Sequence, residues 1–599
     1  MAAKVAFMLA CREGHDFALG DVCSVLTHGL SLDLSTSLYI VSLPFLLMMV
    51  SIWWQQARVL NLILRVYFAI IAVALSLAFV ADSSLYPFWG FKLDASCLQY
   101  LETPTEAMAS VSTGYVVLRV LLFLLVAAVV FWGYGASMPT GASMPTGAAM
   151  PTGASMPSMK YRVIETLGYV LAIPLIVIGI RGGLGESTTN IGQVYFSSNQ
   201  FLNHSAVNPV FSFVASFEKT ASNNVSYHFM DDAQCRRMIG ELYHTESVGA
   251  DTLLTTQRPN IIVILLESCG GTFTEIGGRS DVTPNLNRLA REGIYFTNCY
   301  GNTWRTDRGT VCTWSGYPSF PTMSVMKMPA KSHTLPCLAR TLQQQRGYST
   351  YYLYGGDINF TNMRSYLVGG GFETLKWMKD YAAEEQASAK WGVRDDITFG
   401  SLAEMAATAQ QPFLIGYSTL SSHQPWDVPI QQFDDEVLNA FYYLDQCLGS
   451  FIGKLKQSPL WQNTLVVLLP DHGITYKTID ETHRLKNHIP MIWVGGAVKQ
   501  PRCIEQVCNQ TDLPATLLGQ LGLSHRDYTF SRDVLSKTYT QPFAINTFDD
   551  GFSMYDSTSF VNYDFISNKV IKAEGPNTAL LIERAKAILQ AASDDLNKR

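Results

Sequence analysis

The sequence predicts a helical membrane part followed by an α/β domain with a mainly parallel sheet. A chain of 599 residues exceeds a single typical domain. Its first third holds long apolar windows, each close to the roughly 20 residues that a membrane-spanning helix needs. From residue 258 onward, short apolar runs alternate with amphipathic helical stretches, which is typical of strands and helices that build a parallel sheet.

Four apolar windows are expected to cross the membrane. They are Leu38–Trp54, Leu62–Ala81, Tyr115–Trp132 and Val163–Ile180. Only 15% of the chain is charged, against the usual quarter, and the deficit lies in this region. Aromatic residues flank the windows, as they do at membrane interfaces. Buried core helices are the alternative, but four such windows in succession favour a membrane.

The charges in the connecting loops predict the orientation of the spans. Arg58 follows the first window, and Lys160 and Arg162 precede the fourth, whereas the loop 82–114 is rich in acidic residues. Because basic loops stay in the cytoplasm, everything after Arg181 is expected outside the cytoplasmic membrane. Four spans then place the N-terminus outside as well. Either the apolar run Val5–Ala10 is the remnant of a first span, or the first 35 residues lie along the outer surface.

The domain boundaries follow from these changes in pattern. We expect a transmembrane domain at 1–181, an extracytoplasmic linker at 182–257, a catalytic α/β domain at 258–547 and its C-terminal extension at 548–599. Residues 135–157 repeat Gly-Ala-Ser-Met-Pro-Thr, and a proline in every unit prevents a helix there. A flexible cytoplasmic loop is the favoured interpretation, with a partner-binding motif as the alternative.

Five apolar runs are expected to be strands of the sheet, and the chain is expected to end in a helix. The runs are Ile261–Leu266, Thr350–Tyr354, Phe413–Tyr417, Leu465–Leu469 and Met491–Val494. The Ala, Leu and Ile periodicity of Asn577–Ala592 predicts the terminal amphipathic helix.

Ligand-type residues follow two of these strands directly. Glu267 ends the first run, and Asp471 with His472 ends the fourth. The carboxyl ends of parallel strands meet at one edge of a sheet, so these side chains are expected to converge. A carboxylate buried there is costly unless it is paired or binds a metal, and the mixed oxygen and nitrogen donors suit Zn²⁺ or Mn²⁺, with Mg²⁺ as a further candidate. A solvated glutamate at a loop start is the alternative for Glu267.

Thr306 begins a predicted helix, with Asp307 after it. A capping threonine is one interpretation. The other is chemical, because a helix N-terminus attracts anions and a threonine hydroxyl beside a metal can act as a nucleophile on phosphorus.

Four further polar residues follow strands in the same way. His423 comes after the third run, and Asp357, Asn362 and Arg364 come after the second. Arginine suits bidentate phosphate recognition, and histidine can protonate a leaving alkoxide. Each could equally be a structural residue, but their common position after strands favours a site.

From Arg258 to about Leu523 the chain resembles the lipoteichoic acid synthase family, in the sulfatase-like branch of the alkaline phosphatase superfamily. The matching pieces are Asn260–Ser268, Pro284–Leu286 with Gly293–Phe296, Arg305–Gly309 with Ser315–Pro318, the segment around His423, Asp471–Gly473, and Arg181–Gly183 after the last span. The resemblance implies a sulfatase/alkaline phosphatase-like fold. It also implies Glu267, Thr306, Asp471 and His472 as metal ligands, Thr306 as nucleophile, and His423, Asp357 and Arg364 in substrate binding.

The sequence departs from this family in two places. Asn362 stands where the founding members carry Trp, so its pocket for headgroup or acceptor is expected to differ, and the chain shows four spans where the family usually has five. The Cys-x-Pro-x-Arg signature of true sulfatases is absent, since Thr313-Trp314-Ser315 follows Cys312. The pattern associated with phosphoethanolamine transferases is also missing.

The expected function is transfer of a phosphoglycerol-type group from a phospholipid through Thr306 to an extracytoplasmic acceptor alcohol. The acceptor is a glycan, a polymer or a lipid. A phosphoethanolamine transferase, or a phosphodiesterase or sulfatase-like hydrolase, is the enzymatic alternative, and a metal-free polymer-binding or sensor protein is the alternative of another class. The net charge of −6 gives no reason to expect nucleic acid. An oxidising compartment also allows a predicted Cys503–Cys508 disulfide.

Overall fold

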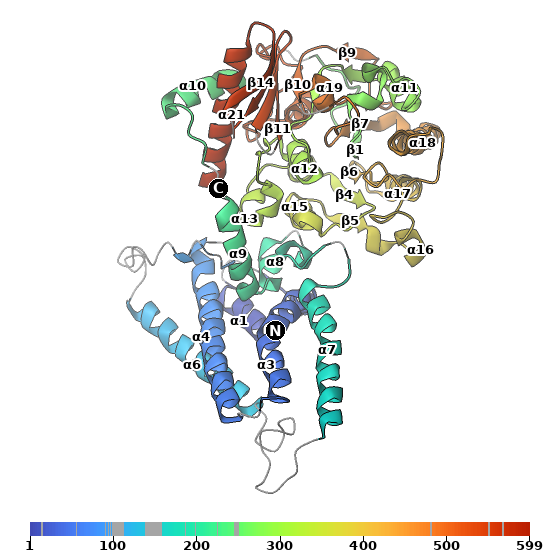
Figure 1. Ribbon diagram of the computed structural model, residues 1–599. Coiled ribbons are helices and arrows are strands. Elements are labelled where there is room, and N and C mark those ends of the chain that lie inside the picture. The colour runs from blue at the N-terminus through green and yellow to red at the C-terminus, as the bar shows by residue number, and fades with distance from the viewer. Residues whose placement is uncertain are drawn as a thin grey trace. The chain divides into compact units, whose positions relative to one another are not determined.

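The computed structural model forms two compact units, Met1–Asn223 and Asn224–Arg599, which are described separately (Figure 1). It describes residues 1–12, 16–54, 57–89, 92–93, 95, 97–98, 113–137, 158–185, 187–197, 199–223, 226–244, 251–479, 482–548, 551–565 and 568–599. The Gly-Ala-Ser-Met-Pro-Thr repeat lies outside these ranges from residue 138 onward.

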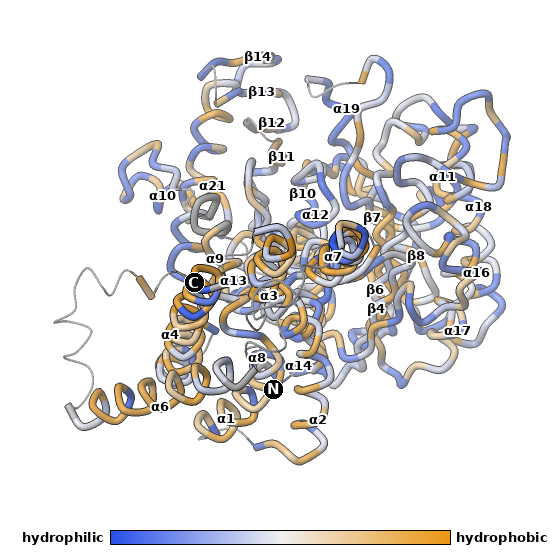
Figure 2. Tube along the Cα trace, turned by 60° about the horizontal axis from the view of Figure 1, so that its bottom comes forward, coloured by the Kyte–Doolittle hydropathy of each residue, from blue (hydrophilic) through white to orange (hydrophobic). Residues whose placement is uncertain are grey.

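The four apolar windows are helices of the first unit, as predicted. They are α3 (Leu30–Ser51), α4 (Ala57–Trp89), α6 (Thr113–Ser137) and α7 (Met159–Arg181). Each is long and apolar enough to cross a membrane, and their apolar colouring is visible in Figure 2. Exposed leucines such as Leu118 and Leu171 lie on α6 and α7, as expected for surfaces that face lipid.

The segments before and after the spans fold together. The helices α1 (Ala2–Ala10) and α2 (Leu19–His28) contact α8 (Gln200–Ala206). Phe7, Val25 and Phe201 share one buried cluster with Tyr86 at the end of α4. Since α1 precedes the first span and α8 follows the last, both ends of the unit lie on the same side of the spans.

An eight-stranded, mainly parallel sheet forms the core of the second unit, as predicted. Its order is β5-β4-β6-β1-β7-β8-β2-β9, and only β8 runs antiparallel to its neighbours among the described strands. The strands are β1 (Asn260–Leu266), β2 (Ile294–Phe296), β4 (Ser349–Tyr354), β5 (Thr374–Trp377), β6 (Phe413–Ser418), β7 (Thr464–Pro470), β8 (Met491–Val494) and β9 (Arg502–Ile504). All five predicted runs are therefore strands.

Helices cover both faces of this sheet, which is why its central strands are continuously apolar. Ile261 and Val263 of β1 enter one buried cluster, and Ile262 and Ile264 enter the other. The first cluster contains side chains of α12 (Thr306–Ser315), α14 (Leu338–Arg346) and α20 (Leu513–Gln520), and the second contains side chains of α11 (Pro284–Glu292), α17 (Asp395–Thr408) and α18 (Glu436–Gln457).

A four-stranded antiparallel sheet completes the second unit. It consists of β11 (Ala544–Phe548), β12 (Gly551–Tyr555), β13 (Phe560–Asp564) and β14 (Lys569–Glu574). The predicted terminal helix is α21 (Thr578–Lys598), which packs on this sheet together with α10 (Asp232–Tyr243). The segment expected as a linker is thereby divided, because residues up to Asn223 fold with the spans and α10 folds with the C-terminal sheet.

The predicted Cys503–Cys508 disulfide is wrong in this structure, where both thiols are free. Cys503 is exposed on β9, which pairs with β2 at the edge of the large sheet. Cys508 is buried on β10 (Cys508–Asn509), which pairs instead with β3 (Cys299–Tyr300) and sets Cys508 opposite Cys299. The two cysteines therefore belong to different strand pairs.

Candidate active site

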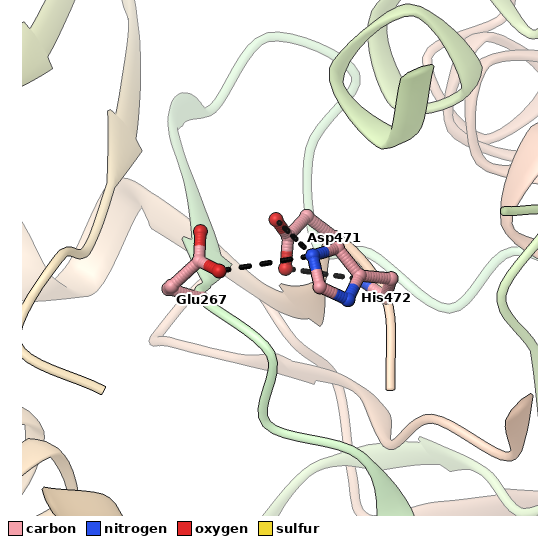
Figure 3. A group of neighbouring side chains, drawn as sticks. All are labelled: Glu267, Asp471 and His472. Atoms are coloured by element: carbon pink, nitrogen blue, oxygen red, sulfur yellow. Dashed lines mark hydrogen bonds and ion pairs between the residues drawn. The ribbon is translucent and has the colours of Figure 1, made fainter. Parts of the chain in front are cut away.

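The candidate site is built at the carboxyl ends of β1 and β7. These strands are adjacent and parallel, with Leu266 opposite Pro470. Glu267 and Asp471 follow these residues, so they leave the sheet at the same level. Figure 3 shows dashed lines from the Glu267 and the Asp471 carboxylates to the same nitrogen of the His472 ring.

Glu267, Asp471 and His472 form one buried cluster. Their ligand atoms all lie within 4.8 Å of one another. His472 Nε2 lies 3.7 Å from Glu267 Oε1 and 3.4 Å from Asp471 Oδ2. The side chains are 4%, 0% and 7% exposed, respectively, so water solvates neither carboxylate well. The side chains at the two strand ends therefore converge, as predicted.

The electrostatics of the cluster favour a cation between these groups. Burial, and then the negative charge of Asp471, raise the pKa of Glu267 above its usual range. Asp471 Oδ2 is buried and accepts no hydrogen bond from the described residues. Two carboxylates and one imidazole with an orphaned oxygen are a donor set that suits Zn²⁺ or Mn²⁺.

Thr306 reaches this cluster with its hydroxyl. It is the first residue of α12, and Arg305 is the N-cap residue, with no capping bond from its side chain. Thr306 Oγ1 donates to Glu267 Oε2 at 3.2 Å and lies 3.5 Å from His472 Nε2. The capping interpretation of Thr306 is therefore wrong, because this hydroxyl points to the ligand cluster.

Glycines allow α12 and the neighbouring loop to approach the cluster closely. A Cβ at Gly309 would lie 2.3 Å from the Asp471 carbonyl oxygen, and one at Gly473 would lie 1.9 Å from the carbonyl oxygen of Lys486. Buried Gln510 joins the same region, since its Nε2 donates to the Asp471 carbonyl oxygen at 2.8 Å and to that of Gly309 at 3.3 Å. Larger residues at these glycines would push the hydroxyl and the ligands apart.

Hydroxyl residues that sequence analysis missed hold Glu267 in place. Ser268 Oγ donates to Glu267 Oε1 at 2.7 Å, and Ser422 Oγ donates to the Glu267 carbonyl oxygen at 2.7 Å. The Glu267 amide donates to Thr419 Oγ1 at 2.9 Å. Thr419 and Ser422 follow β6 as Glu267 follows β1, so the same strand-end signal that selected His423 covers them.

His423 lies on the loop after β6, which is braced by a segment before α17. Its Nδ1 lies 2.7 Å from the Gln424 carbonyl oxygen, and the Trp391 ring meets the His423 ring edge-on with centroids 4.7 Å apart. Trp391 Nε1 also donates to the Gln424 carbonyl oxygen at 2.6 Å. These contacts leave His423 Nε2 as the ring nitrogen available to a substrate.

Asp395, at the start of α17, fixes the same loop and was also missed. Its carboxylate accepts hydrogen bonds from the Leu420 amide at 2.9 Å and the Ser421 amide at 3.2 Å. Burial raises the pKa of Asp395 to about 6. An acidic residue is common in the first turn of a helix, so no local pattern in the sequence indicates that Asp395 fixes the loop of His423.

The residues after β4 form a third group. Arg364 is largely buried, its Nε donates no hydrogen bond to the described residues, and burial lowers its pKa. Asp357 Oδ1 accepts from the amide and the side chain of Asn359, both at 3.0 Å. Asn362 is buried, and its side chain donates to the Lys327 carbonyl oxygen at 3.5 Å. A largely buried guanidinium whose Nε has no hydrogen-bond acceptor among the described residues favours an anionic ligand.

Comparison with known proteins agrees with this arrangement. Residues 259–523 match the family model described as Sulfatase. We refer to residues 259–523, after this similarity, as the sulfatase domain. Phosphoglycerol transferase I of Xanthomonas campestris pv. campestris is 25% identical over 304 residues, which are 47% of this chain and 43% of that protein. Lipoteichoic acid synthase 2 of Bacillus subtilis is 25% identical over 350 residues, or 53% and 51% of the two chains.

Two solved structures share the fold of the sulfatase domain. A protein of the alkaline phosphatase superfamily from Vibrio parahaemolyticus has a TM-score of 0.54 at 28% identity and covers 62% of this chain and 98% of its own. The lipoteichoic acid synthase LtaP from Listeria monocytogenes has a TM-score of 0.51 at 19% identity, with 61% and 98% covered. These findings confirm the resemblance to the lipoteichoic acid synthase-like family. The chain spans about half the length of the curated relatives it matches.

The sulfatase domain brings some predicted residues together and leaves others apart. Glu267, Thr306, Asp471 and His472 are in mutual reach. His423 contacts Trp391 and the backbone of its own loop. Asp357, Asn362 and Arg364 lie after β4, the strand beside β6. Burial, and then the charge of Glu267, raise the pKa of the Tyr354 hydroxyl at the end of β4, with a smaller contribution from Asp357. Tyr354 is thus electrostatically coupled both to the ligand cluster and to the residues after β4.

Proposed function

We propose that this protein is a membrane-anchored, metal-dependent phosphotransferase. It takes a phosphoglycerol-type group from a phospholipid onto Thr306 and passes it to an acceptor alcohol, which is a glycan, a polymer or a lipid. The observation that carries the proposal is the Thr306 hydroxyl, which lies 3.2 Å from Glu267 Oε2 and 3.5 Å from His472 Nε2 and caps no helix. A binding or sensor protein would have no use for a hydroxyl held against three ligand-type side chains.

Glu267, Asp471 and His472, with Thr306, are the residues that would hold the metal ion. The orphaned Asp471 Oδ2 and the two poorly solvated carboxylates fit a divalent cation. Such an ion supplies positive charge that favours the ionised hydroxyl and offsets charge on phosphoryl oxygens. Zn²⁺ and Mn²⁺ suit the donor set best, with Mg²⁺ as a further candidate.

The chain's own residues account for two successive displacements. Thr306 Oγ1 forms a bond to phosphorus as the bond from phosphorus to the diacylglycerol oxygen breaks, and the hydroxyl proton has an acceptor in Glu267 Oε2. The leaving oxygen takes a proton from His423 Nε2, and the diacylglycerol departs. The acceptor oxygen then bonds to phosphorus as the bond from phosphorus to Thr306 Oγ1 breaks. His423 Nε2 takes the acceptor's proton, and Thr306 Oγ1 regains its proton from Glu267 Oε2.

The polar residues after β4 are proposed to hold the transferred group. The Arg364 Nε has no hydrogen-bond acceptor among the described residues, and the guanidinium suits the phosphate oxygens. Asp357 and Asn362 lie in the same connection and are proposed to contact the headgroup. Asn362 stands where a larger aromatic residue is expected from the resemblance, so the group it faces should be bulkier or differently oriented.

The membrane unit is proposed to keep the sulfatase domain outside the cytoplasmic membrane, near its lipid donor. The basic residues Arg58, Lys160 and Arg162 in two loops support this orientation. Cysteines introduced at Ser143 and Ser187 test it with an impermeant thiol reagent. We expect labelling at position 187 in intact cells and protection at position 143. The reverse pattern would contradict the proposed orientation.

A covalent-intermediate experiment tests the proposed function. The purified full chain is incubated with headgroup-labelled phospholipids and no acceptor, quenched, and digested for mass spectrometry. We expect a headgroup-phosphate adduct on the peptide containing Thr306, and none in Thr306→Ala, while Thr306→Ser keeps part of the adduct. If Thr306→Ala still cleaves donor at the wild-type rate, water is the nucleophile and the protein is a hydrolase. An adduct from phosphatidylethanolamine but not phosphatidylglycerol would identify a phosphoethanolamine transferase.

A further inference from the structure

Two cysteines of the sulfatase domain lie opposite each other on neighbouring strands. β10 pairs with β3 in parallel, and the register sets Cys508 opposite Cys299. Side chains at the same level of adjacent strands point to the same side of a sheet. Both cysteines are 0% exposed, and the Cys508 side chain is the hydrogen-bond partner of the Cys299 thiol. The two sulfur atoms therefore face each other in the core, as free thiols in this structure.

The spacing of these two strands suits a disulfide bond. Neighbouring strands lie about 4.7–4.9 Å apart, and the Cα atoms of disulfide-bonded cysteines are usually ~4.4–6.8 Å apart. Hydrogen bonds fix the register on both sides of the pair. The Cys508 amide donates to the Asn298 carbonyl oxygen at 3.0 Å, and Asn509 Nδ2 donates to that of Tyr300 at 2.7 Å. The backbone is therefore in place for a bond between the two sulfur atoms.

The cysteine pair lies at the base of two segments that build the candidate active site. β3 leads within a few residues to Thr306, and β10 leads directly to Gln510. Asn302 joins the two segments, because its amide donates to Gln510 Oε1 at 3.2 Å. Gln510 Nε2 in turn donates to the Asp471 carbonyl oxygen at 2.8 Å. A covalent bond between the cysteines would therefore tie the segment of the proposed nucleophile to the segment that holds a proposed metal ligand.

We propose that Cys299 and Cys508 form a disulfide bond once the sulfatase domain is outside the cytoplasmic membrane. This rests on the orientation given under the proposed function, since disulfides form and persist in oxidising compartments. The oxidant is a molecule that carries a reactive disulfide. The thiolate of one cysteine attacks it, which forms a mixed disulfide and releases one oxidant sulfur. The thiolate of the other cysteine then displaces the second oxidant sulfur, so that two electrons and the two cysteine protons end on the oxidant as two thiols.

Burial of the pair decides when this bond forms. Both side chains are closed to solvent in the folded domain, and burial raises the pKa of the Cys299 thiol well above its ordinary value. A folded domain thus offers the oxidant neither access nor thiolate at this position. Exchange takes place while the chain is still folding, and the same burial then protects the finished bond from reductants.

Alkylation of the full chain without reductant tests this proposal. Membranes that contain the protein are denatured in the presence of iodoacetamide, digested and mapped by mass spectrometry. We expect the Cys299 peptide to be joined to the Cys508 peptide, with a mass lower by two hydrogen atoms than that of the two reduced peptides. Cys503, which is exposed and lies opposite Tyr295, should carry the alkyl label. Alkylation of both Cys299 and Cys508, or a bond from Cys508 to Cys503, would overturn the proposal.

Single and double substitutions separate a covalent bond from mere packing. Cys299→Ala, Cys508→Ala and the double variant all remove the same bond, which closes a long loop of the unfolded chain. Their midpoints of thermal unfolding should therefore fall by a similar amount, on the order of 10 °C. Cys503→Ala is the matched control and should leave the midpoint unchanged. A double variant that loses about the sum of the two single losses would show that the cysteines only pack, and would overturn the proposal.

The disulfide and the proposed function fail separately. Thr306→Ala should abolish the headgroup adduct and leave the joined Cys299 and Cys508 peptides unchanged, because the exchange uses no group of the active site. Joined peptides without any headgroup transfer in the wild type would keep the disulfide and remove the transferase. Headgroup transfer by a wild type whose two cysteines are alkylated would keep the transferase and remove the disulfide.

Discussion

Ser422 Oγ donates a hydrogen bond of 2.7 Å to the backbone carbonyl oxygen of Glu267. This bond ties the loop that carries His423 to the strand end that carries a ligand of the proposed metal. Both residues are buried, so the carbonyl oxygen has no water to replace this donor. Together with the bond from the Glu267 amide to Thr419 Oγ1, it holds the proposed acid near the ligand cluster.

Ser422→Ala should therefore weaken both stability and transfer. Leaving the Glu267 carbonyl oxygen buried without a donor costs about 1–3 kcal/mol, which denaturant unfolding of the full chain measures. Thr408→Ala is the matched control, because Thr408 Oγ1 makes a similar bond of 2.9 Å to the Glu404 carbonyl oxygen at an exposed position of α17. Equal effects of the two substitutions would show that the Ser422 bond has no special role.

Arg364→Lys should be nearly as harmful to transfer as Arg364→Ala. Lysine keeps the charge but loses the planar fork that binds two phosphate oxygens at once, so kcat/KM should fall by roughly 10- to 100-fold, as for about 1.5–3 kcal/mol from a charged hydrogen bond. Arg291→Lys, at a side chain 62% exposed and paired with Glu275, is the control. Near-normal activity of Arg364→Lys would mean that only a positive charge is needed there.

His423→Ala should slow the natural lipid donor more than a substrate with a good leaving group. A general acid contributes about 10²- to 10⁴-fold, and an activated leaving group needs little of this help. Turnover of phosphatidylglycerol and of an aryl phosphodiester gives the comparison. Gln424→Ala is the control, because only the backbone carbonyl of Gln424 contacts His423. Equal losses on both substrates would leave His423 as a binding residue.

Asp395 should make stability depend on pH in an unusual direction. Its pKa is raised to about 6 in the folded chain, against ~3.9 when unfolded, so the folded state holds the proton more tightly. The stability from this group is complete below about pH 4 and is lost as pH rises through about 6. The difference in free energy of unfolding between the wild type and Asp395→Asn should therefore move in favour of the wild type as pH falls from 7 to 4, by at most roughly 3 kcal/mol. Thermal unfolding at several pH values tests this, and a constant difference would contradict it.

The sequence predicted the sheet and the ligand cluster because both depend on local pattern. Strands buried on both faces are continuous apolar runs, and Glu267 and Asp471 follow two of them directly. The carboxyl ends of parallel strands lie at one edge of a sheet, so a site at that edge was predictable. That β1 and β7 are direct neighbours depends on the strand order, which the structure shows.

The remaining features depend on contacts between distant segments. Whether Thr306 caps the helix or points to Glu267 depends on where the helix begins, and Arg305 takes the cap position. Cys508 pairs with β3, which no spacing near Cys503 reveals. Asp395 became a site residue only because α17 starts beside the loop after β6.

The buried cluster of α1, α2 and α8 constrains the order in which the membrane unit is assembled. Phe7 and Val25 are synthesised first, but they pack on Phe201, which follows all four spans. During synthesis, the apolar sides of α1 and α2 therefore stay uncovered until the fourth span has been inserted. Contacts between such distant segments form slowly. Closure of this cluster is consequently a late event that marks completion of the whole bundle, and a chain halted before the fourth span would leave an aggregation-prone surface.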